Sequence, residues 1–392
     1  MAEWIECKIS DIGTVVGGAT PSTKKTENYE GGSIAWITPK DLSTFSGRYI
    51  KKGERNITDL GLKSCSTQLL PKDTVLFSSR APIGYVAIAA NKVCTNQGFK
   101  SVIPNENTDP LFLYYLLKYN KDRIESLGSG TTFKEVSGNT MKNVEVRVPK
   151  DKKVQSRIAS IIGSIDDKIE ENERINNNLE QQAKAIFANE FLISETLPEN
   201  WIQSNLIDIA DYLNGLAMQK YRPSANETGI PVLKIKELRQ GCCDDNSELC
   251  SPNIKRDYII HDGDVIFSWS GSLLVDFWCG GTCGLNQHLF KVTSSKYDKW
   301  FYYAWTKHHL DRFIAVAADK ATTMGHIKRD ELEKAEVLIP NEADYNRIGG
   351  LLQPIYDLII ANRIENKKLA ETRDSLLPKL MSGELDVSDI DI

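Results

Sequence analysis

The sequence predicts an α+β protein in which two tandem mixed α/β globular domains alternate with two long helices. Three observations predict it. The chain of 392 residues is too long for one ordinary core. The second half of the sequence repeats the first. Each half ends with a polar segment whose few apolar residues follow a heptad pattern. We expect these two helices to pair as an antiparallel coiled coil.

The repeat has a shift of about 190 residues. The segment "WIECKISDIGTVVGG" at Trp4 is echoed by "WIQSNLIDIADYLNG" at Trp201, and "PKDTVLFSS" at Pro71 is echoed by "HDGDVIFSW" at His261. Copies of this length indicate a domain duplication. The division we predict is 1–150 for the first globular domain, 151–195 for the first helix, 196–340 for the second globular domain, 341–382 for the second helix and 383–392 for an acidic C-terminal tail.

Each globular domain is expected to be a mixture of short strands and one helix. In the first domain "DTVLFSS", "GYVAIAA", "FKSVIP" and "VEVRVP" predict strands, because runs of β-branched and aromatic residues are broken by Gly, Pro and Asn. The segments "DPLFLYYLLKYN" and "KWFYYAWTKHHLDRF" each predict one amphipathic helix.

The two long helices share one apolar seam, whose members are separated by four and three residues in alternation. A seam this narrow needs one partner helix, and the other copy is the obvious one. In the first helix the seam is Ile158, Ile162, Ile165, Ile169, Asn172, Asn176, Leu179, Ala183 and Ile186. In the second helix it is Ile348, Leu352, Ile355, Ile359, Asn362, Asn366, Leu369, Arg373 and Leu376.

Asparagines interrupt both seams near their centres. A polar residue at a seam position specifies register, because only one alignment pairs it. In a centred antiparallel pair Asn172 would meet Asn366, and Asn176 would meet Asn362. The alternative is that these side chains face water at a frayed crossing. Pro354 lies inside the second seam and should kink that helix or mark its effective start.

Composition excludes several classes of protein. No segment reaches the roughly 20 apolar residues that a membrane helix needs, and "MAEWIECKIS" lacks the pattern of a signal peptide. Eight cysteines without such a signal indicate reduced thiols and a cytoplasmic location. Cys279 and Cys283 lack a second matched pair, so we expect ordinary buried cysteines and no metal. The net charge is −5, but residues 1–150 are basic, which leaves a nucleic-acid partner possible.

Motifs for catalysis are missing from the sequence. There is no phosphate-binding loop of the type G-x-x-x-x-G-K-[ST], and "GTVVGGATPSTK" does not supply one. No dinucleotide, zinc-protease, hydrolase or methyltransferase motif stands out, and the five histidines are scattered. The chain is therefore expected to be a binding scaffold with no catalytic residues.

These features resemble the specificity subunit of type I restriction–modification enzymes along the whole chain. The segments that carry the resemblance are "TPSTKKTENYEGGSIAWITPKDL", "LLPKDTVLFSSRAPIGYVAI", "NQGFKSVIP", "VPKDKKVQSRIASIIGSIDDKIEENERINNNLE" and "LAETRDSLLPKLMSGELDVSDI". The resemblance implies two target-recognition domains, each of which reads half of a bipartite, asymmetric site in double-stranded DNA, with a coiled coil that fixes the spacer.

The resemblance also implies partners and cofactors. The chain would bind no cofactor itself. It would recruit two modification subunits, which methylate adenine with S-adenosylmethionine, and restriction subunits, which translocate and cut DNA with ATP and Mg²⁺. An alternative from another class is a tandem protein-interaction scaffold without nucleic acid, and a third is a standalone methyltransferase or nuclease.

Candidate DNA-binding residues are the basic and hydroxyl residues expected in loops, since these types meet phosphates and base edges. In the first domain they are Thr20, Ser22, Thr23, Lys24, Lys25, Lys40, Ser78, Ser79, Arg80, Lys100, Thr131, Thr132 and Lys134. In the second domain they are Lys220, Tyr221, Arg222, Lys234, Lys236, Ser268, Ser270, Lys320, Thr322, Thr323, His326 and Lys328.

Arg80 is the foremost candidate, because "SSRAPIG" places it on a tight turn between two apolar strands. The competing interpretation is that most of these residues are solvated surface groups. For Trp36, Trp269 and Tyr85 the competing interpretation is a place in the core, and it is favoured most for Trp36. The pair Asn96-Gln97 returns as Asn286-Gln287 and is expected to cap a turn rather than read bases.

Overall fold

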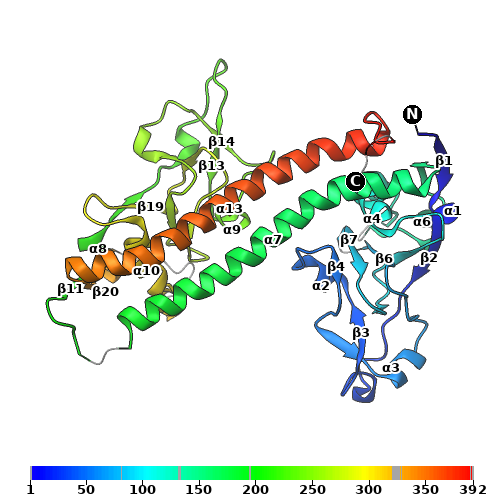
Figure 1. The fold of residues 1–392 in the computed structure, drawn as a ribbon, viewed down its shortest axis with the longest axis horizontal. Coiled ribbons are helices and arrows are strands. Elements are labelled where there is room, and N and C mark those ends of the chain that lie inside the picture. Colours follow the sequence, from blue (N-terminus) through cyan, green and yellow to red (C-terminus); the bar gives the residue numbers. More distant parts are fainter. Residues whose placement is uncertain are drawn as a thin grey trace. The chain divides into compact units, whose positions relative to one another are not determined.

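The computed structural model describes residues 2–80, 82–130, 134–193, 196–319, 327, 329–388 and 390. The chain forms two compact units (Figure 1). Unit 1 comprises Met1–Glu170 with Leu369–Ile392, and unit 2 comprises Glu171–Lys368. Both unit boundaries fall inside the two longest helices, α7 (Lys152–Phe191) and α13 (Glu342–Ser382).

Unit 1 contains three sheets. Their hydrogen-bonded orders are β2-β9-β6-β7-β4, β5-β3-β8 and β1-β10. The strands are β1 (Trp4–Lys8), β2 (Gly13–Gly17), β3 (Ile34–Ile37), β4 (Tyr49–Ile50), β5 (Arg55–Ile57), β6 (Val75–Ser79), β7 (Ile83–Ala89), β8 (Cys94–Thr95), β9 (Lys100–Pro104) and β10 (Glu145–Pro149). The shorter helices are α1 (Ile9–Ile12), η1 (Thr26–Asn28), α2 (Pro39–Ser43), α3 (Asp59–Lys63), α4 (Pro110–Tyr119), α5 (Lys121–Ser126) and α6 (Gly138–Lys142).

Unit 2 repeats this plan, with the orders β12-β19-β16-β17, β14-β13-β18-β15 and β11-β20. Its strands are β11 (Ile202–Asn205), β12 (Asp211–Asn214), β13 (Ile230–Leu233), β14 (Leu249–Cys250), β15 (Ile259–Ile260), β16 (Val265–Ser268), β17 (Leu274–Phe277), β18 (Cys283–Leu285), β19 (Leu289–Thr293) and β20 (Glu336–Ile339). Its shorter helices are α8 (Leu206–Ile209), η2 (Met218–Lys220), α9 (Ile235–Gln240), η3 (Arg256–Tyr258), α10 (Lys299–His308), α11 (Leu310–Asp319) and α12 (Arg329–Glu333).

The duplication read from the sequence is therefore present in the topology. The central strand β6 pairs antiparallel with β7 and β9, as β16 does with β17 and β19. In each unit the second sheet contains a short parallel pair, β3 with β8 or β13 with β18. The four strands expected in the first domain are confirmed as β6, β7, β9 and β10.

The helices of the globular parts are more numerous than the sequence predicted. Asp109 accepts a hydrogen bond from the Phe112 amide at 2.8 Å and starts α4, with Pro110 in the first turn. The segment expected to be one helix through Phe313 is divided at His309 into α10 and α11. The ring nitrogen Nε2 of the buried His309 bonds to the Glu336 carbonyl at 2.8 Å, which ties this break to β20.

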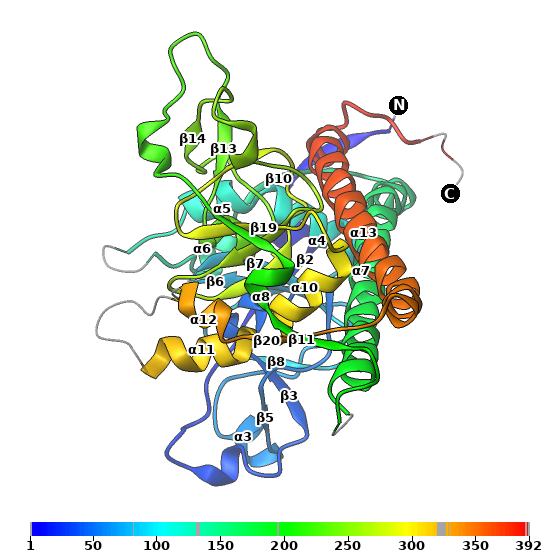
Figure 2. The same ribbon diagram turned by 90° about the vertical axis from the view of Figure 1, so that its left-hand side faces the viewer.

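Helices α7 and α13 run antiparallel wherever they meet within a unit. In unit 2, whose parts of the two helices lie side by side in both views (Figure 1, Figure 2), Asn172 Nδ2 donates to Asn366 Oδ1 at 2.8 Å. Asn362 Nδ2 donates to Asn176 Oδ1 at 2.9 Å. The expected pairing of asparagines is confirmed. Because Asn172, Asn176 and Asn362 are buried, the alternative of a water-facing crossing is wrong.

In unit 1 a charged contact joins the antiparallel parts of α7 and α13. Arg373 Nη1 of α13 donates to Asp166 Oδ1 of α7 at 2.9 Å, and Tyr115 of α4 donates to Asp166 Oδ2 at 2.6 Å. The C-terminal tail also packs here, because Val387 is buried in the core of unit 1.

Pro354 does not mark the start of the second long helix, because α13 begins at Glu342 and continues to Ser382. A proline inside a helix removes one backbone donor and crowds the carbonyl four residues earlier, here that of Gly350. Glycine adds no side chain to that crowded turn. Among the described residues, no helix is both long and apolar enough to cross a bilayer.

The asparagine pair gives a stability prediction. The substitution Asn362→Leu leaves Asn176 Oδ1 without its donor, so we expect the free energy of unfolding to fall by about 1–3 kcal/mol. The double variant Asn176→Leu with Asn362→Leu removes both polar groups and should recover most of this loss. Urea unfolding monitored by circular dichroism measures both.

Gln182→Leu is the matched control, since Gln182 donates to Asn178 on the exposed face of the same helix. Its effect should stay within about 0.5 kcal/mol. A single Asn362→Leu variant as stable as the parent would contradict the assigned role of the pair.

Candidate nucleic-acid interface

The end of β6 in unit 1 brings together candidate residues from separate parts of the chain. The backbone of Val136 donates to the Ser79 carbonyl at 3.0 Å, and Arg80 forms an antiparallel bridge with Glu135. Unit 2 repeats the first of these bonds, with the Ile327 amide donating to the Trp269 carbonyl at 3.0 Å. Each unit therefore fixes the end of its central strand to an equivalent later segment.

Glu135 joins two candidate cations. Its carboxylate lies 3.7 Å from Arg80 Nη1 and 3.2 Å from Lys100 Nζ. Lys100 Nζ also donates to Ser79 Oγ at 3.4 Å. Arg80 keeps about a third of its side chain exposed, whereas Lys100 is mostly covered. Arg80 is thus presented in one preferred place with its charge accessible, as a phosphate or guanine contact requires.

Four serines chosen as loop residues are not exposed. Ser78, Ser79 and Ser268 belong to the central strands, and Ser270 follows directly, all within 2% of full burial. Ser78 Oγ donates to the Pro82 carbonyl and accepts from the Tyr85 amide, each at 2.8 Å. Ser268 Oγ donates to the carbonyl of Ser272 at 2.9 Å. The expectation of exposed hydroxyls is wrong at these positions. Ser78 and Ser268 bond to the turns that follow their strands, whereas Ser79 Oγ donates to the Gly98 carbonyl and Ser270 Oγ pairs with His288 Nδ1.

The loop after β2 presents four candidates on the surface. Ser22, Thr23, Lys24 and Lys25 are exposed. Behind them Tyr29 donates to the Pro21 carbonyl at 2.6 Å, and Asn28 Nδ2 donates to the Ser22 carbonyl at 3.0 Å. The remaining candidate there, Thr20, is hydrogen-bonded to Gln97. These bonds hold the backbone of the loop from which the four exposed side chains project.

The cations near the second sheets are neutralised locally. Lys40 lies 2.7 Å from Glu54 in unit 1, and Lys236 lies 2.9 Å from Asp244 in unit 2. Arg222 and Lys234 converge on Glu248 at 2.6 and 2.5 Å, and the Lys234 bond lowers the pKa of that carboxylate. Exposed ion pairs of this kind contribute little to stability. A phosphate could therefore replace the carboxylate at small cost.

The other predicted residues divide into three sets. Lys134, Lys220 and Tyr221 are exposed in loops or short turns. Asn96 Oδ1 accepts from the Gly98 amide at 2.8 Å and Asn286 Oδ1 from the His288 amide at 3.3 Å, so both asparagines cap a turn as predicted. The candidates outside the described residues are Thr131, Thr132, Lys320, Thr322, Thr323, His326 and Lys328.

The aromatic residues mostly support the fold. Trp36 is buried, and its Nε1 donates to the Ala19 carbonyl at 3.2 Å, as expected of a core residue. Trp269 and Tyr85 are partly buried beside core clusters. Sequence reasoning missed Glu135 and Glu248, the two carboxylates that order the cations. The signal available was only an acidic residue flanking a basic segment, which is common on any surface.

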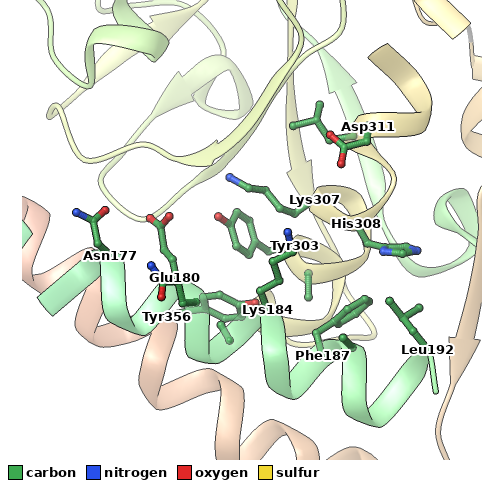
Figure 3. A pocket seen from close by; sticks show the side chains of 15 residues that line it. Asn177, Glu180, Lys184, Phe187, Leu192, Tyr303, Lys307, His308, Asp311 and Tyr356 are labelled. Atoms are coloured by element: carbon green, nitrogen blue, oxygen red, sulfur yellow. The ribbon is translucent and has the colours of Figure 1, made fainter. Parts of the chain in front are cut away.

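Unit 2 also contains an open pocket of about 660 Å³ among α7, α10, α11 and α13 (Figure 3). Phe187, Tyr303 and Tyr356 form its apolar wall, and Lys184 and Glu180 rise from α7 beside them. Burial raises the pKa of the Tyr303 phenol well above its ordinary value.

The repeat explains why this pocket exists. Two alanines that line it, Ala183 and Ala304, stand where unit 1 has Arg373 and Tyr115. In unit 1 those larger side chains both bond to Asp166. Among the described residues, no group of three or more His, Cys, Asp or Glu side chains is placed to hold a metal ion.

Comparison with known proteins assigns the family. The sequence model of the type I restriction modification DNA specificity domain matches residues 1–181 and again residues 198–371. The two matches coincide with the two copies of the repeat and cover most of the chain. The chain therefore belongs to the family of type I restriction–modification DNA specificity subunits.

Individual relatives agree with this assignment along their whole length. The MjaIX specificity subunit of Methanocaldococcus jannaschii is 35% identical over 415 residues, which cover 99% of this chain and 95% of the relative. The HindI specificity subunit of Haemophilus influenzae is 20% identical, and the match covers 98% of this chain and 100% of the relative. The S subunit of a type I restriction-modification system from M. genitalium shares the fold, with a TM-score of 0.62 at 15% sequence identity. The match covers 99% of this chain and 97% of that one.

A pair of neighbouring substitutions separates stability from binding at the end of β6. Ser78→Ala removes a buried hydroxyl with two hydrogen bonds, so we expect unfolding to become easier by about 1–2 kcal/mol with unchanged affinity for DNA. Arg80→Gln should leave the free energy of unfolding within about 0.5 kcal/mol. It should weaken binding to the target duplex by about 1–3 kcal/mol. Thermal unfolding and fluorescence anisotropy measure the two quantities, and the reverse assignment of effects would contradict this account.

Proposed function

We propose that this chain is the non-catalytic specificity subunit of a type I restriction–modification complex, and that each unit reads one half of a bipartite, asymmetric site in double-stranded DNA. The carrying observation is that the family domain occurs twice and that each copy is attached to both long helices. Two copies that share the order of their central strands but differ in exposed side chains suit a target whose halves differ in sequence.

The second part of the proposal gives α7 and α13 the role of a paired-helix spacer, an antiparallel coiled coil. The hydrogen bonds between Asn172 and Asn366 and between Asn176 and Asn362 support it, because they admit one register only. A spacer of constant length suits a bipartite site, since recognition elements about one helical turn apart (~34 Å) meet the same face of the duplex.

The third part concerns partners. We propose that the subunit works in the cytoplasm with two modification subunits, which supply adenine methylation from S-adenosylmethionine, and with restriction subunits, which supply ATP- and Mg²⁺-dependent translocation and cleavage. The chain itself binds DNA and places these activities. The eight free thiols, four of them buried, suit a reducing compartment.

The spacer role is tested by lengthening both helices. Copying one heptad beside the asparagine pair in α7 and in α13 adds about 10 Å at 1.5 Å per residue, close to three base pairs at about 3.4 Å each. The complex should then methylate sites whose halves are unchanged and whose spacer is about three base pairs longer. Sequencing of methylated adenines in cellular DNA measures this.

Insertion into α7 alone is the control for the heptad experiment. It removes the asparagine register and should abolish methylation instead of shifting the spacer. Altered half-sequences in the double insertion would overturn the proposed division of roles.

Binding to DNA itself is tested by salt. Affinity for a duplex that contains both halves should fall steeply and linearly on a double-logarithmic plot against salt concentration, because each neutralised phosphate releases counterions. Neutralising Lys24 and Lys25 together should reduce the magnitude of that slope by about two, because about two fewer phosphates are neutralised. A salt-independent affinity, or none for any duplex, would favour a scaffold that binds only proteins.

A further inference from the structure

In each unit one arginine links the globular part to the long helices, beside the apolar contacts that these helices make with the core. In unit 1 this residue is Arg48, in the turn before β4, and its side chain is 5% exposed. Its Nε donates to Glu170 Oε1 of α7 at 2.9 Å, its Nη1 donates to the Gly163 carbonyl at 3.3 Å, and its guanidinium also pairs with Asp167. The Arg48 backbone amide donates to the same Glu170 oxygen at 3.2 Å.

Unit 2 makes the corresponding connection through Arg363 of α13. Its Nη1 donates to Asp276 Oδ1 at 2.7 Å and to the Phe277 carbonyl at 3.4 Å, both in β17. Its Nη2 donates to Glu180 Oε1 of α7 at 2.9 Å, on the rim of the pocket in Figure 3. One side chain thus joins two long helices and the main sheet of the unit.

The two connections are not copies of each other. In unit 1 the arginine comes from the globular part and its acids from the helix, whereas in unit 2 the arginine comes from the helix and one acid from the sheet. Under the shift of 190 residues, Arg363 corresponds to Glu173. Duplication therefore does not explain why both units link their globular part to a long helix through an arginine. The two units make this link with residues at different positions of the repeat.

The chemistry of arginine suits an orientation contact. A guanidinium is planar and presents five donors in fixed directions, so several acceptors fix its plane as well as its position. Because the Arg48 side chain is covered, removing one of its acids leaves a guanidinium with fewer partners and costs more than the loss of an exposed ion pair. An ammonium would hold the same distance but would leave the angle free.

We propose that Arg48 and Arg363 are positioning residues that set the angle of each globular part on its long helix and so fix the spacing between the two halves of the DNA site. This inference rests on the proposed bipartite recognition. One extra base pair moves a half-site by about 3.4 Å and turns it by about a tenth of a helical turn. A globular domain held at one angle does not bind a half-site displaced in this way, whereas a domain that can tilt does bind it.

The test uses the full complex with its companion subunits and three duplexes. They carry the site mapped by methylation sequencing with the native spacer, one base pair more and one base pair less. For the parent complex we expect strong preference for the native spacer. For Arg48→Met and for Arg363→Met we expect this preference, as a ratio of methylation rates, to fall by about tenfold, while substitutions within either half-site stay as harmful as before.

The controls separate this role from general stability. Arg174→Met removes an exposed ion pair with Glu171 on the same helix and should leave the ratio unchanged. Arg48→Lys should restore folding but only part of the preference. If Arg48→Met does not fold, Glu170→Gln decides, because it removes the charge and keeps the shape of the acceptor.

The outcomes distinguish the two proposals. An unchanged spacer preference in Arg363→Met and in Arg48→Met (or Glu170→Gln) overturns the positioning role while bipartite recognition stands. Equal loss of methylation on all three duplexes also overturns it, since that is the signature of a merely structural residue. A parent complex without any spacer preference would instead refute the proposed function.

Discussion

The pairing of two buried asparagine layers between antiparallel helices is the constraint on which the rest depends. An amide buried in a helix seam must find its partner or forfeit its hydrogen bonds, so Asn172 with Asn366 and Asn176 with Asn362 select one alignment of α7 and α13. Leucine in these places would tolerate slippage by a turn. Register, rather than maximal stability, is what the sequence secures here.

Around this constraint the two units share a plan and differ in chemistry. Both attach a central antiparallel sheet and a smaller sheet with a parallel pair to the long helices. Unit 1 fills its helix contact with Tyr115, Asp166 and Arg373, whereas unit 2 has alanines there and an open pocket. The two units thus share a frame but differ at their helix contacts, as the proposed reading of two different half-sites needs.

The sequence predicted the parts of the structure that have a period. The alternation of four and three located both helices and their partners, and β-branched runs located the main strands. It failed where tertiary contacts decide: His309 divides a helix by bonding to β20, and Ser78 satisfies a buried turn that looked like an exposed loop. It could not reveal Glu135 or the acids around Arg48, because their partners are distant in sequence. Which candidate side chains touch DNA stays a prediction.

The distance between the two globular parts in solution is the most direct test of a spacer of fixed length. Spin labels at exposed positions 24 and 220, with the half-buried Cys7, Cys65, Cys242 and Cys243 changed to serine, would allow it to be measured by pulsed dipolar spectroscopy. The account predicts one narrow distribution that is unchanged by DNA and broadened when both asparagine pairs are replaced by leucine. A broad distribution in the parent protein would contradict a spacer of fixed length.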